Sequence, residues 1–321
     1  MSGFFGRVAR PTILAASRSD GLRRTAEKLP VTRKVVQRFV PGETVGDAID
    51  SVAVLRNSGR YVSIDYLGED VTDADAADAT VQAYLGLLSA LGERDDTAAG
   101  PKPLEVSLKL SALGQALPRD GEKIALENAH TICAKARDVG AWVTVDAEDH
   151  TTTDSTLSIV RDLRVEFDWL GTVLQAYLRR TRGDCAEFAA SGARIRLCKG
   201  AYDEPASVAF RDADDVTDSY LTCLRILMEG RGYPMVASHD PEIIAAVPGL
   251  VRESGRSADD FEYQMLFGIR DAEQLRLGAE GNHVRVYVPF GTEWYGYFVR
   301  RLAERPANLT FFLRALAERR G

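Results

Sequence analysis

The chain has 321 residues, of which 45% are hydrophobic and 27% charged, and a formal net charge of -7 at pH 7. These values are typical of a globular protein, and the acidic balance argues against a nucleic-acid partner, which usually requires a basic surface. No apolar run approaches the roughly 20 residues of a membrane-spanning helix, and the N-terminal stretch lacks a signal-peptide core, so we expect a cytoplasmic protein.

The cysteines and histidines show no spacing that is typical of a metal site. Four cysteines are scattered without a C-x-x-C pair, and the four histidines are not clustered. We therefore expect reduced thiols and no bound metal.

Two amphipathic segments open the chain. Residues 21–39 and 44–58 carry apolar side chains at three- and four-residue spacing, which indicates helices. We expect residues 1–59 to form a helical segment packed on the main domain, residues 60–321.

From residue 60 onward, short β-branched runs alternate with longer helical patterns. Eight strands alternating with helices predict parallel βαβ units, and eight is the number that closes a barrel. A doubly wound open sheet is disfavoured because the chain has no G-x-G-x-x-G motif. The predicted fold class is therefore α/β, a (β/α)8 TIM-type barrel with extra N-terminal helices. The strands are expected at 61–67, 104–110, 142–147, 171–177, 194–199, 234–239, 261–266 and 284–289, with helices that include 74–91, 122–139, 215–229 and 271–277.

Polar residues fall at or near the ends of seven of the eight expected strands. A solvated strand end explains any single one of them as well as a functional role does, but it explains seven poorly. The C-terminal strand ends of such a barrel form the mouth of the active site, where buried charges need partners or a ligand. These residues are Asp65, Lys109, Asp146, Gln175, Arg196, Lys199, His239 and Tyr287.

Charge at this mouth leans positive, which predicts an anionic ligand that carries a carboxylate, a phosphate or both. Lys109, Arg196, Lys199, Arg300 and Arg301 stand against Asp65, Asp146 and Glu148. Tyr297, Arg300 and Arg301 would share one face of a helix, although two arginines near a helix end are also explained by its dipole. Likewise, the Lys199-Gly200 pair suits phosphate binding but is also found in ordinary turns.

Eight ordered motifs resemble the proline dehydrogenase family, including the dehydrogenase domain of the bifunctional proline utilisation enzymes. They run through almost the whole expected barrel. In order they are VSLKLSALG, VDAED, LQAYLRR, RIRLCKGAY, SHD, EYQMLFGIR, VRVYVPFGTEW and YFVRRLAERPAN.

The resemblance implies an FAD-dependent oxidation of L-proline to 1-pyrroline-5-carboxylate, with hydride transfer to the flavin and electrons passed to a quinone. It implies that Asp146 is the active-site acid and that Arg196 lies beside the isoalloxazine, where it stabilises negative charge on the reduced flavin. The implied carboxylate clamp consists of Lys109, Arg300 and Arg301, and the implied substrate walls are Tyr202, Leu266, Tyr287 and Tyr297. The implied FAD contacts are Ala147, Gln175, Arg196, Lys199, Gly200, Ala201, Ser238 and His239.

The chain departs from the bifunctional enzymes after KGAY. Those enzymes often carry Trp there, whereas this chain has Asp203-Glu204-Pro205, closer to the monofunctional bacterial form. We therefore expect a separate pyrroline-5-carboxylate dehydrogenase to catalyse the second step of proline breakdown. Electron transfer to quinone implies a peripheral contact with the inner face of the membrane.

Two other functions stay open at this point. Lys199 at a strand end could form a Schiff base, as in a class I aldolase with a phosphorylated substrate. A non-catalytic barrel that senses amino acids would bind proline without transferring electrons.

Overall fold

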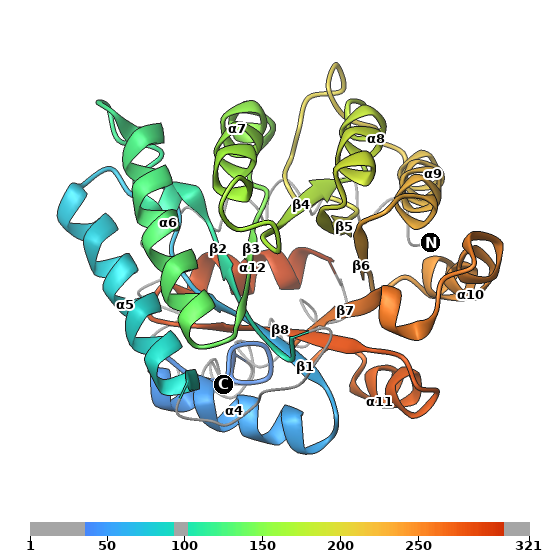
Figure 1. The fold of residues 1–321 in the computed structure, drawn as a ribbon, viewed down its shortest axis with the longest axis horizontal. Helices are drawn as coiled ribbons and strands as arrows, with labels where there is room; N and C mark the ends of the chain where they lie inside the picture. The colour runs from blue at the N-terminus through green and yellow to red at the C-terminus, as the bar shows by residue number, and fades with distance from the viewer. Residues whose placement is uncertain (1–35, 93–101, 305–321) are drawn as a thin grey trace, which may run out of the picture.

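The computed structural model describes residues 36–92 and 102–304, and its centre is a closed barrel of eight parallel strands (Figure 1). Each strand pairs with the next along the chain, and β8 closes the ring on β1, with Ser63 opposite Tyr287. This confirms the predicted (β/α)8 class. The strands are β1 (Tyr61–Tyr66), β2 (Leu104–Leu108), β3 (Trp142–Val145), β4 (Gly171–Gln175), β5 (Arg194–Cys198), β6 (Tyr233–Ala237), β7 (Glu262–Leu266) and β8 (Val284–Phe290).

One helix follows each of the first seven strands and covers the outside of the barrel (Figure 1). These helices are α5 (Ala74–Gly92), α6 (Gly121–Asp138), α7 (Thr153–Arg164), α8 (Thr181–Ser191), α9 (Ala213–Glu229), α10 (Pro241–Ser254) and α11 (Asp271–Ala279). Short 3-10 turns lie at Leu110–Leu113, His150–Thr152 and Ala258–Asp260.

The two remaining helices depart from the simple repeat. α4 (Val45–Asn57) precedes β1, packs against β1 and β8, and fills the gap in the ring between α5 and α11 (Figure 1). α12 (Trp294–Glu304) follows β8 and packs near the strand ends. The helix expected at 44–58 is confirmed by α4, whereas most of the one expected at 21–39 lies outside the described residues.

Local sequence explains where the helices begin. Thr44 caps α4 in a capping box, since its hydroxyl accepts from the Asp47 N–H at 3.2 Å while the Asp47 carboxylate accepts from the Thr44 N–H at 2.9 Å. Asp240 caps α10, and Pro241 occupies the first turn, where its missing N–H costs nothing. Asp240 lies three residues after the end of β6, so the start of α10 is close to the end of this strand.

Two apolar clusters hold the fold together. The larger lies between the strands and the helix ring and includes fully buried side chains such as Leu88, Val106 and Ile132. The smaller joins α12 to the segment before α4, to the end of β7 and to β8, and it includes Phe39 and Phe298, with Leu266 packed against it. The smaller cluster therefore fixes α12 beside the barrel mouth.

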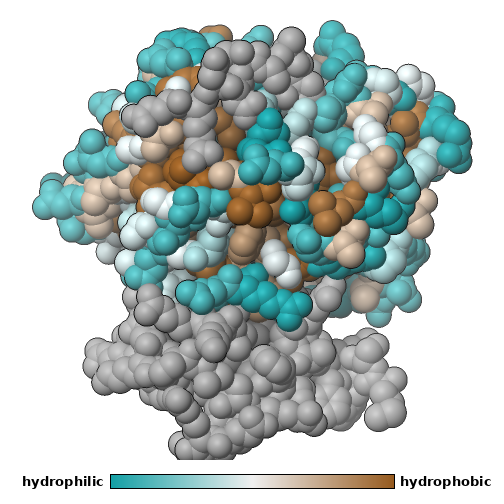
Figure 2. Space-filling model, turned by 90° about the horizontal axis from the view of Figure 1, so that it is seen from below, coloured by the Kyte–Doolittle hydropathy of each residue, from teal (hydrophilic) through white to brown (hydrophobic). Residues whose placement is uncertain are grey.

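Figure 2 shows the face that lies at the bottom of Figure 1, where hydrophobic groups gather among hydrophilic ones. The large exposed hydrophobic side chains that α4 and α11 contribute are Val54 and Leu275. Within the two described ranges, no helix combines the length and apolar character needed to span a bilayer.

Candidate active site at the strand ends

Polar side chains converge inside the barrel because alternate residues of a strand point to the same side. Asp146 lies at the centre of this group, directly after β3. One of its carboxylate oxygens accepts from Arg196 Nη1 at 2.6 Å and from Ser107 Oγ at 3.2 Å. The other accepts from the Tyr287 hydroxyl at 2.8 Å. Asp146 therefore links strands that lie on different sides of the barrel.

Lys109 is also committed to buried carboxylates. Its ammonium donates to Asp65 Oδ2 at 2.6 Å and lies 3.8 Å from Asp146 Oδ2 and 3.4 Å from the Tyr287 hydroxyl. Burial alone would lower the pKa of Lys109, but the carboxylates of Asp65 and Asp146 outweigh it and raise that pKa. Lys109 is therefore a fixed positive charge, which suits binding an anion and not accepting a proton.

All five N–H groups of Arg196 are used within the barrel. The guanidinium is buried at 5% exposure, and its contacts come from β1, β2, β7 and the residue after β3. The acceptors are Gln264 Oε1 at 2.5 Å, Ser107 Oγ at 2.7 Å, Asp146 Oδ1 at 2.6 Å, Ser63 Oγ at 3.0 Å and Glu105 Oε1 at 2.7 Å.

The expected cluster on α12 borders a cavity at the mouth. The cavity of about 600 Å³ lies between α12 and the segment after β1, with Tyr297, Arg300 and Glu69 in its wall. Arg300 makes a two-pronged ion pair with Glu69, at 3.2 and 2.5 Å. The Arg301 guanidinium lies 5.1 Å from the centre of the Tyr297 ring, so these two side chains share one helix face as predicted.

The other expected substrate contacts surround this cluster. Leu266 and Tyr287 are half-buried and pack against the apolar cluster that holds α12. Tyr202 is half-buried too; burial raises its pKa, and Glu69 and Arg300 act on it electrostatically. These side chains therefore lie around one mouth, although they come from three separate parts of the chain.

The expected cofactor residues lie at the ends of β3 to β6. Lys199 Nζ donates to Asp240 Oδ2 at 2.7 Å and to Thr217 Oγ1 at 2.8 Å. His239 accepts from the Leu266 N–H at 2.9 Å, and Ser238 Oγ accepts from the Asp240 N–H at 3.1 Å. Ala147 and Ala201 are half-buried beside them.

Gln175 is the last residue of β4, and only the nitrogen of its side-chain amide has a hydrogen-bond partner among the described residues. Its Nε2 donates to the Glu148 carbonyl at 2.7 Å, while its buried Oε1 has no hydrogen-bond partner among the described residues. A buried amide oxygen without a donor is costly, so this atom marks a position where a ligand donor fits.

Gly200 is required by the packing of the segment after β5. Its φ of 110° lies in the region that favours glycine, and an added Cβ would lie 2.1 Å from the Tyr177 ring. The Tyr177 ring by itself therefore accounts for a glycine at this position, and the expected contact with phosphate stays a prediction.

Glu148 ties the loops of the mouth together. Its carboxylate accepts from the Ser111 N–H at 3.1 Å and from the Ser111 hydroxyl. Ser111 Oγ in turn accepts from the Asp70 N–H at 3.0 Å, next to Glu69. Burial raises the pKa of Glu148 to about 7, against the opposing effect of the Ser111 bonds.

Sequence reasoning missed two carboxylates that matter here, Glu69 and Glu105. As a result it overestimated the positive excess at the mouth, because Lys109, Arg196 and Arg300 each face a carboxylate of the chain. Glu105 could have been found: with Ser107 and Lys109 it forms a run of polar residues at two-residue spacing on a strand that is otherwise apolar. Glu69 lies in a loop and gives no such signal.

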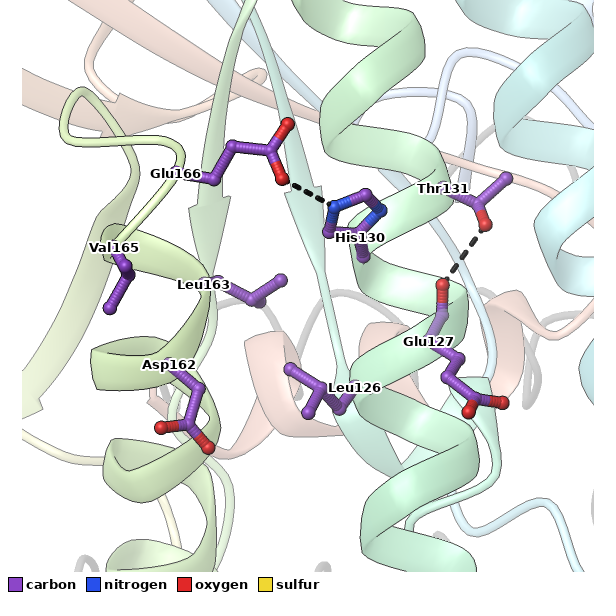
Figure 3. A pocket seen from close by; sticks show the side chains of 8 residues that line it. All are labelled: Leu126, Glu127, His130, Thr131, Asp162, Leu163, Val165 and Glu166. Atoms are coloured by element: carbon purple, nitrogen blue, oxygen red, sulfur yellow. Dashed lines mark hydrogen bonds and ion pairs between the residues drawn. The ribbon is translucent and has the colours of Figure 1, made fainter.

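A second cavity lies on the outside of the ring, in the groove between α6 and α7 (Figure 3). Its walls include His130, which bonds to Glu166 at 2.8 Å, and the exposed Val165. All its lining residues belong to these helices and the turn after α7, so the site at the strand ends is the better candidate for chemistry.

Comparison with known proteins identifies the family of this chain. The family model described as proline dehydrogenase matches residues 48–314. Proline dehydrogenase of Deinococcus radiodurans is 41% identical over 284 residues, which cover 88% of this chain and 90% of the relative. Proline dehydrogenase 1 of Bacillus subtilis is 38% identical over 288 residues, which cover 90% and 92%.

Solved structures show the same likeness. The crystal structure of proline utilization A (PutA) from Bdellovibrio bacteriovorus, inactivated by N-propargylglycine, superposes with a TM-score of 0.77 at 25% identity. The match covers 84% of this chain and 32% of that one. This chain belongs to the proline dehydrogenase family, and it is an oxidoreductase of proline breakdown.

Proposed function

We propose that the protein oxidises L-proline to 1-pyrroline-5-carboxylate with FAD as the bound acceptor, the first step in the degradation of proline to glutamate. Family membership supports the reaction, and the observation that carries the proposal is the ring of fixed charges at the strand ends, with Lys109 and Arg196 buried and Arg300 beside a cavity. FAD, when bound, supplies a two-electron acceptor that takes a hydride from the substrate ring.

The residues at the ends of β3 to β6 fit such a group. Gln175 Oε1 is a buried acceptor in need of a donor, and Lys199 is a cation that is about one-third exposed and pairs with Asp240. We assign FAD contacts to Ala147, Gln175, Arg196, Lys199, Gly200, Ala201, Ser238 and His239. Lys199 and the backbone of Gly200 and Ala201 would serve the phosphates.

The proline carboxylate is bound, we propose, by Lys109, Arg300 and Arg301. In this structure Arg300 already holds the carboxylate of Glu69, so a substrate carboxylate competes with Glu69 for the same guanidinium. Tyr202, Leu266, Tyr287 and Tyr297 would enclose the ring of the substrate. Tyrosine and leucine surfaces suit the apolar pyrrolidine ring, because they exclude water from it.

Two groups do the positioning at the reacting centre. Asp146 accepts from Tyr287 and Arg196 together, so it holds the phenol that faces the substrate and the guanidinium that faces the acceptor in one arrangement. Arg196 places a permanent positive charge where negative charge develops during the oxidation.

Electrons then pass to a quinone, and we propose a cytoplasmic protein that touches the inner face of the membrane transiently. A separate pyrroline-5-carboxylate dehydrogenase is the functional partner that consumes the product.

The visible spectrum of the purified protein tests the proposal. We expect flavin absorbance that bleaches when proline is added without oxygen. We also expect a yellow supernatant after acid precipitation, because the sequence shows no motif for covalent attachment of a flavin and the flavin should therefore be bound non-covalently. A colourless protein that traps a substrate on Lys199 with borohydride would favour an aldolase. Proline binding without bleaching would favour a sensor.

A further inference from the structure

Below the mouth, the barrel interior carries a second set of buried charges that the proposed reaction does not use. Glu105, Glu262 and Arg285 have 0% exposure, and Arg194 has 5%. Together with Arg196 and Asp146 they make a balanced set of three guanidinium groups and three carboxylates. Burying such a set carries a large desolvation penalty, so its contribution to stability alone does not explain its presence.

Glu105 occupies the key position in this set. One carboxylate oxygen accepts from Arg196 Nη2 at 2.7 Å, and the other accepts from Arg194 Nη2. Two further contacts fix Arg194. Its guanidinium carbon lies 3.6 Å from the centre of the Trp142 ring, and its Nη1 donates to the Trp169 carbonyl at 3.2 Å. Glu105 is therefore anchored on one side and holds Arg196 on the other.

The charges around Glu105 keep it ionised. Burial alone would raise the pKa of Glu105, but the guanidinium groups of Arg285, Arg194 and Arg196 outweigh it and lower that pKa. The carboxylates of Glu105 and Asp146 thus both pair with the guanidinium of Arg196. Their two negative charges exceed its single positive charge.

We propose that Glu105 is a positioning residue that orients the Arg196 guanidinium and moderates its charge, and so sets the reduction potential of the bound flavin. This rests on the proposed function. All five Arg196 donors have acceptors in the chain, so the guanidinium is held in one orientation, from which it would act on the flavin chiefly through its electric field. A field of this kind depends on the net charge nearby, and Glu105 is a large part of it.

The test is the midpoint potential of the purified, flavin-loaded protein in three variants. Glu105→Gln removes one negative charge beside Arg196, so reduced flavin is stabilised and the potential rises above that of wild type. Glu262→Gln is the matched control: it is equally buried and loses the same charge, but its carboxylate bonds Arg285 and Gln264 instead of Arg196. We expect a clearly smaller shift in the control. Equal shifts, or no shift in Glu105→Gln, would overturn the inference.

Glu105→Asp separates position from charge, and it keeps the inference testable if the Gln variant does not fold. The aspartate keeps the negative charge but is too short to hold both arginines. We expect a potential close to that of wild type and flavin reduction by proline slower by on the order of tenfold, since small displacements of a catalytic group are costly. An unchanged reduction rate would contradict a positioning role. A wild-type protein without flavin would overturn the proposed function first and this inference with it.

Discussion

The ion pairs inside the barrel and those at its mouth use the same side-chain types but differ in their access to water. The Arg285 and Glu262 side chains are both 0% exposed, whereas those of Arg300 and Glu69 are 18% and 26% exposed. Breaking an inner pair leaves a charge without water or partner, but an outer pair can exchange one carboxylate for another. We therefore expect the inner ion pairs to contribute mainly to folding stability, and the pairs at the mouth to affect mainly ligand binding.

The largest effect is expected from breaking an inner pair. Arg285→Met leaves the Glu262 carboxylate buried and unpaired, so we expect the free energy of unfolding to fall by about 3–5 kcal/mol in urea denaturation. The matched control is Arg225→Met on the surface, where Arg225 and Glu253 are 53% and 60% exposed and a loss below about 1 kcal/mol is expected. Similar losses in the two variants would remove the distinction between interior and surface.

Glu148 extends the comparison because it is buried at the mouth and has no ion-pair partner within residues 36–92 and 102–304. Its pKa is about 7 in the folded protein against an ordinary value of 4.5. The folded state therefore holds its proton more tightly, so the stabilisation is complete below pH 4.5 and is lost as pH rises to about 7. The full loss is about 3 kcal/mol.

Glu148→Gln carries no titrating group and should not show this loss. We expect the free energy of unfolding, measured between pH 4.5 and 8, to fall less steeply in Glu148→Gln than in wild type. Glu229→Gln on an exposed helix position should leave the slope unchanged. Identical slopes for wild type and Glu148→Gln would show that Glu148 does not titrate in this range.

At the mouth, the clamp arginines should affect substrate binding rather than folding. Arg300→Met and Arg301→Met each remove a charge-assisted bond worth about 1.5–3 kcal/mol, so KM for proline should rise about 10-fold to 100-fold. Flavin content, read from absorbance, should change little, and Arg276→Met on the outer helix α11 should leave KM as it is. A wild-type KM in either clamp variant would remove that residue from the clamp.

The smallest expected effect concerns the choice of substrate. Tyr297 is buried at 6% exposure beside the cavity at the mouth, and the family resemblance suggests that a smaller residue here favours hydroxyproline. Tyr297→Ser should lose efficiency on proline and gain relative efficiency on trans-4-hydroxyproline, by about 1–3 kcal/mol in the ratio of kcat/KM. A purely structural Tyr297 would lower both activities together, and an unchanged ratio in a folded variant would exclude a steric filter.

Strand positions were predictable because strands that are buried on both faces read as short β-branched runs. All eight strands lie within one residue of their expected starts. Four of them, β2, β3, β4 and β6, end two residues early, and β2 and β3 do so directly before Lys109 and Asp146. Both residues leave the ladder because their side chains turn into the mouth, where Asp65 and Arg196 bind them. Helix α4 was predictable too, but not its place between α5 and α11, since packing on β1 and β8 decides that.

The sequence by itself determined the barrel, because hydrophobic periodicity and the eight-fold alternation are local properties of the chain. It also determined that charged groups end the strands. Only the tertiary structure decided which charged side chains form ion pairs with each other. Arg300 and Glu69 are 231 residues apart in the chain, and Arg196 and Glu105 are 91 apart. Their pairing depends on barrel closure, strand register and the position of α12, because a side chain's electrostatic partner is whatever folding brings within a few ångströms.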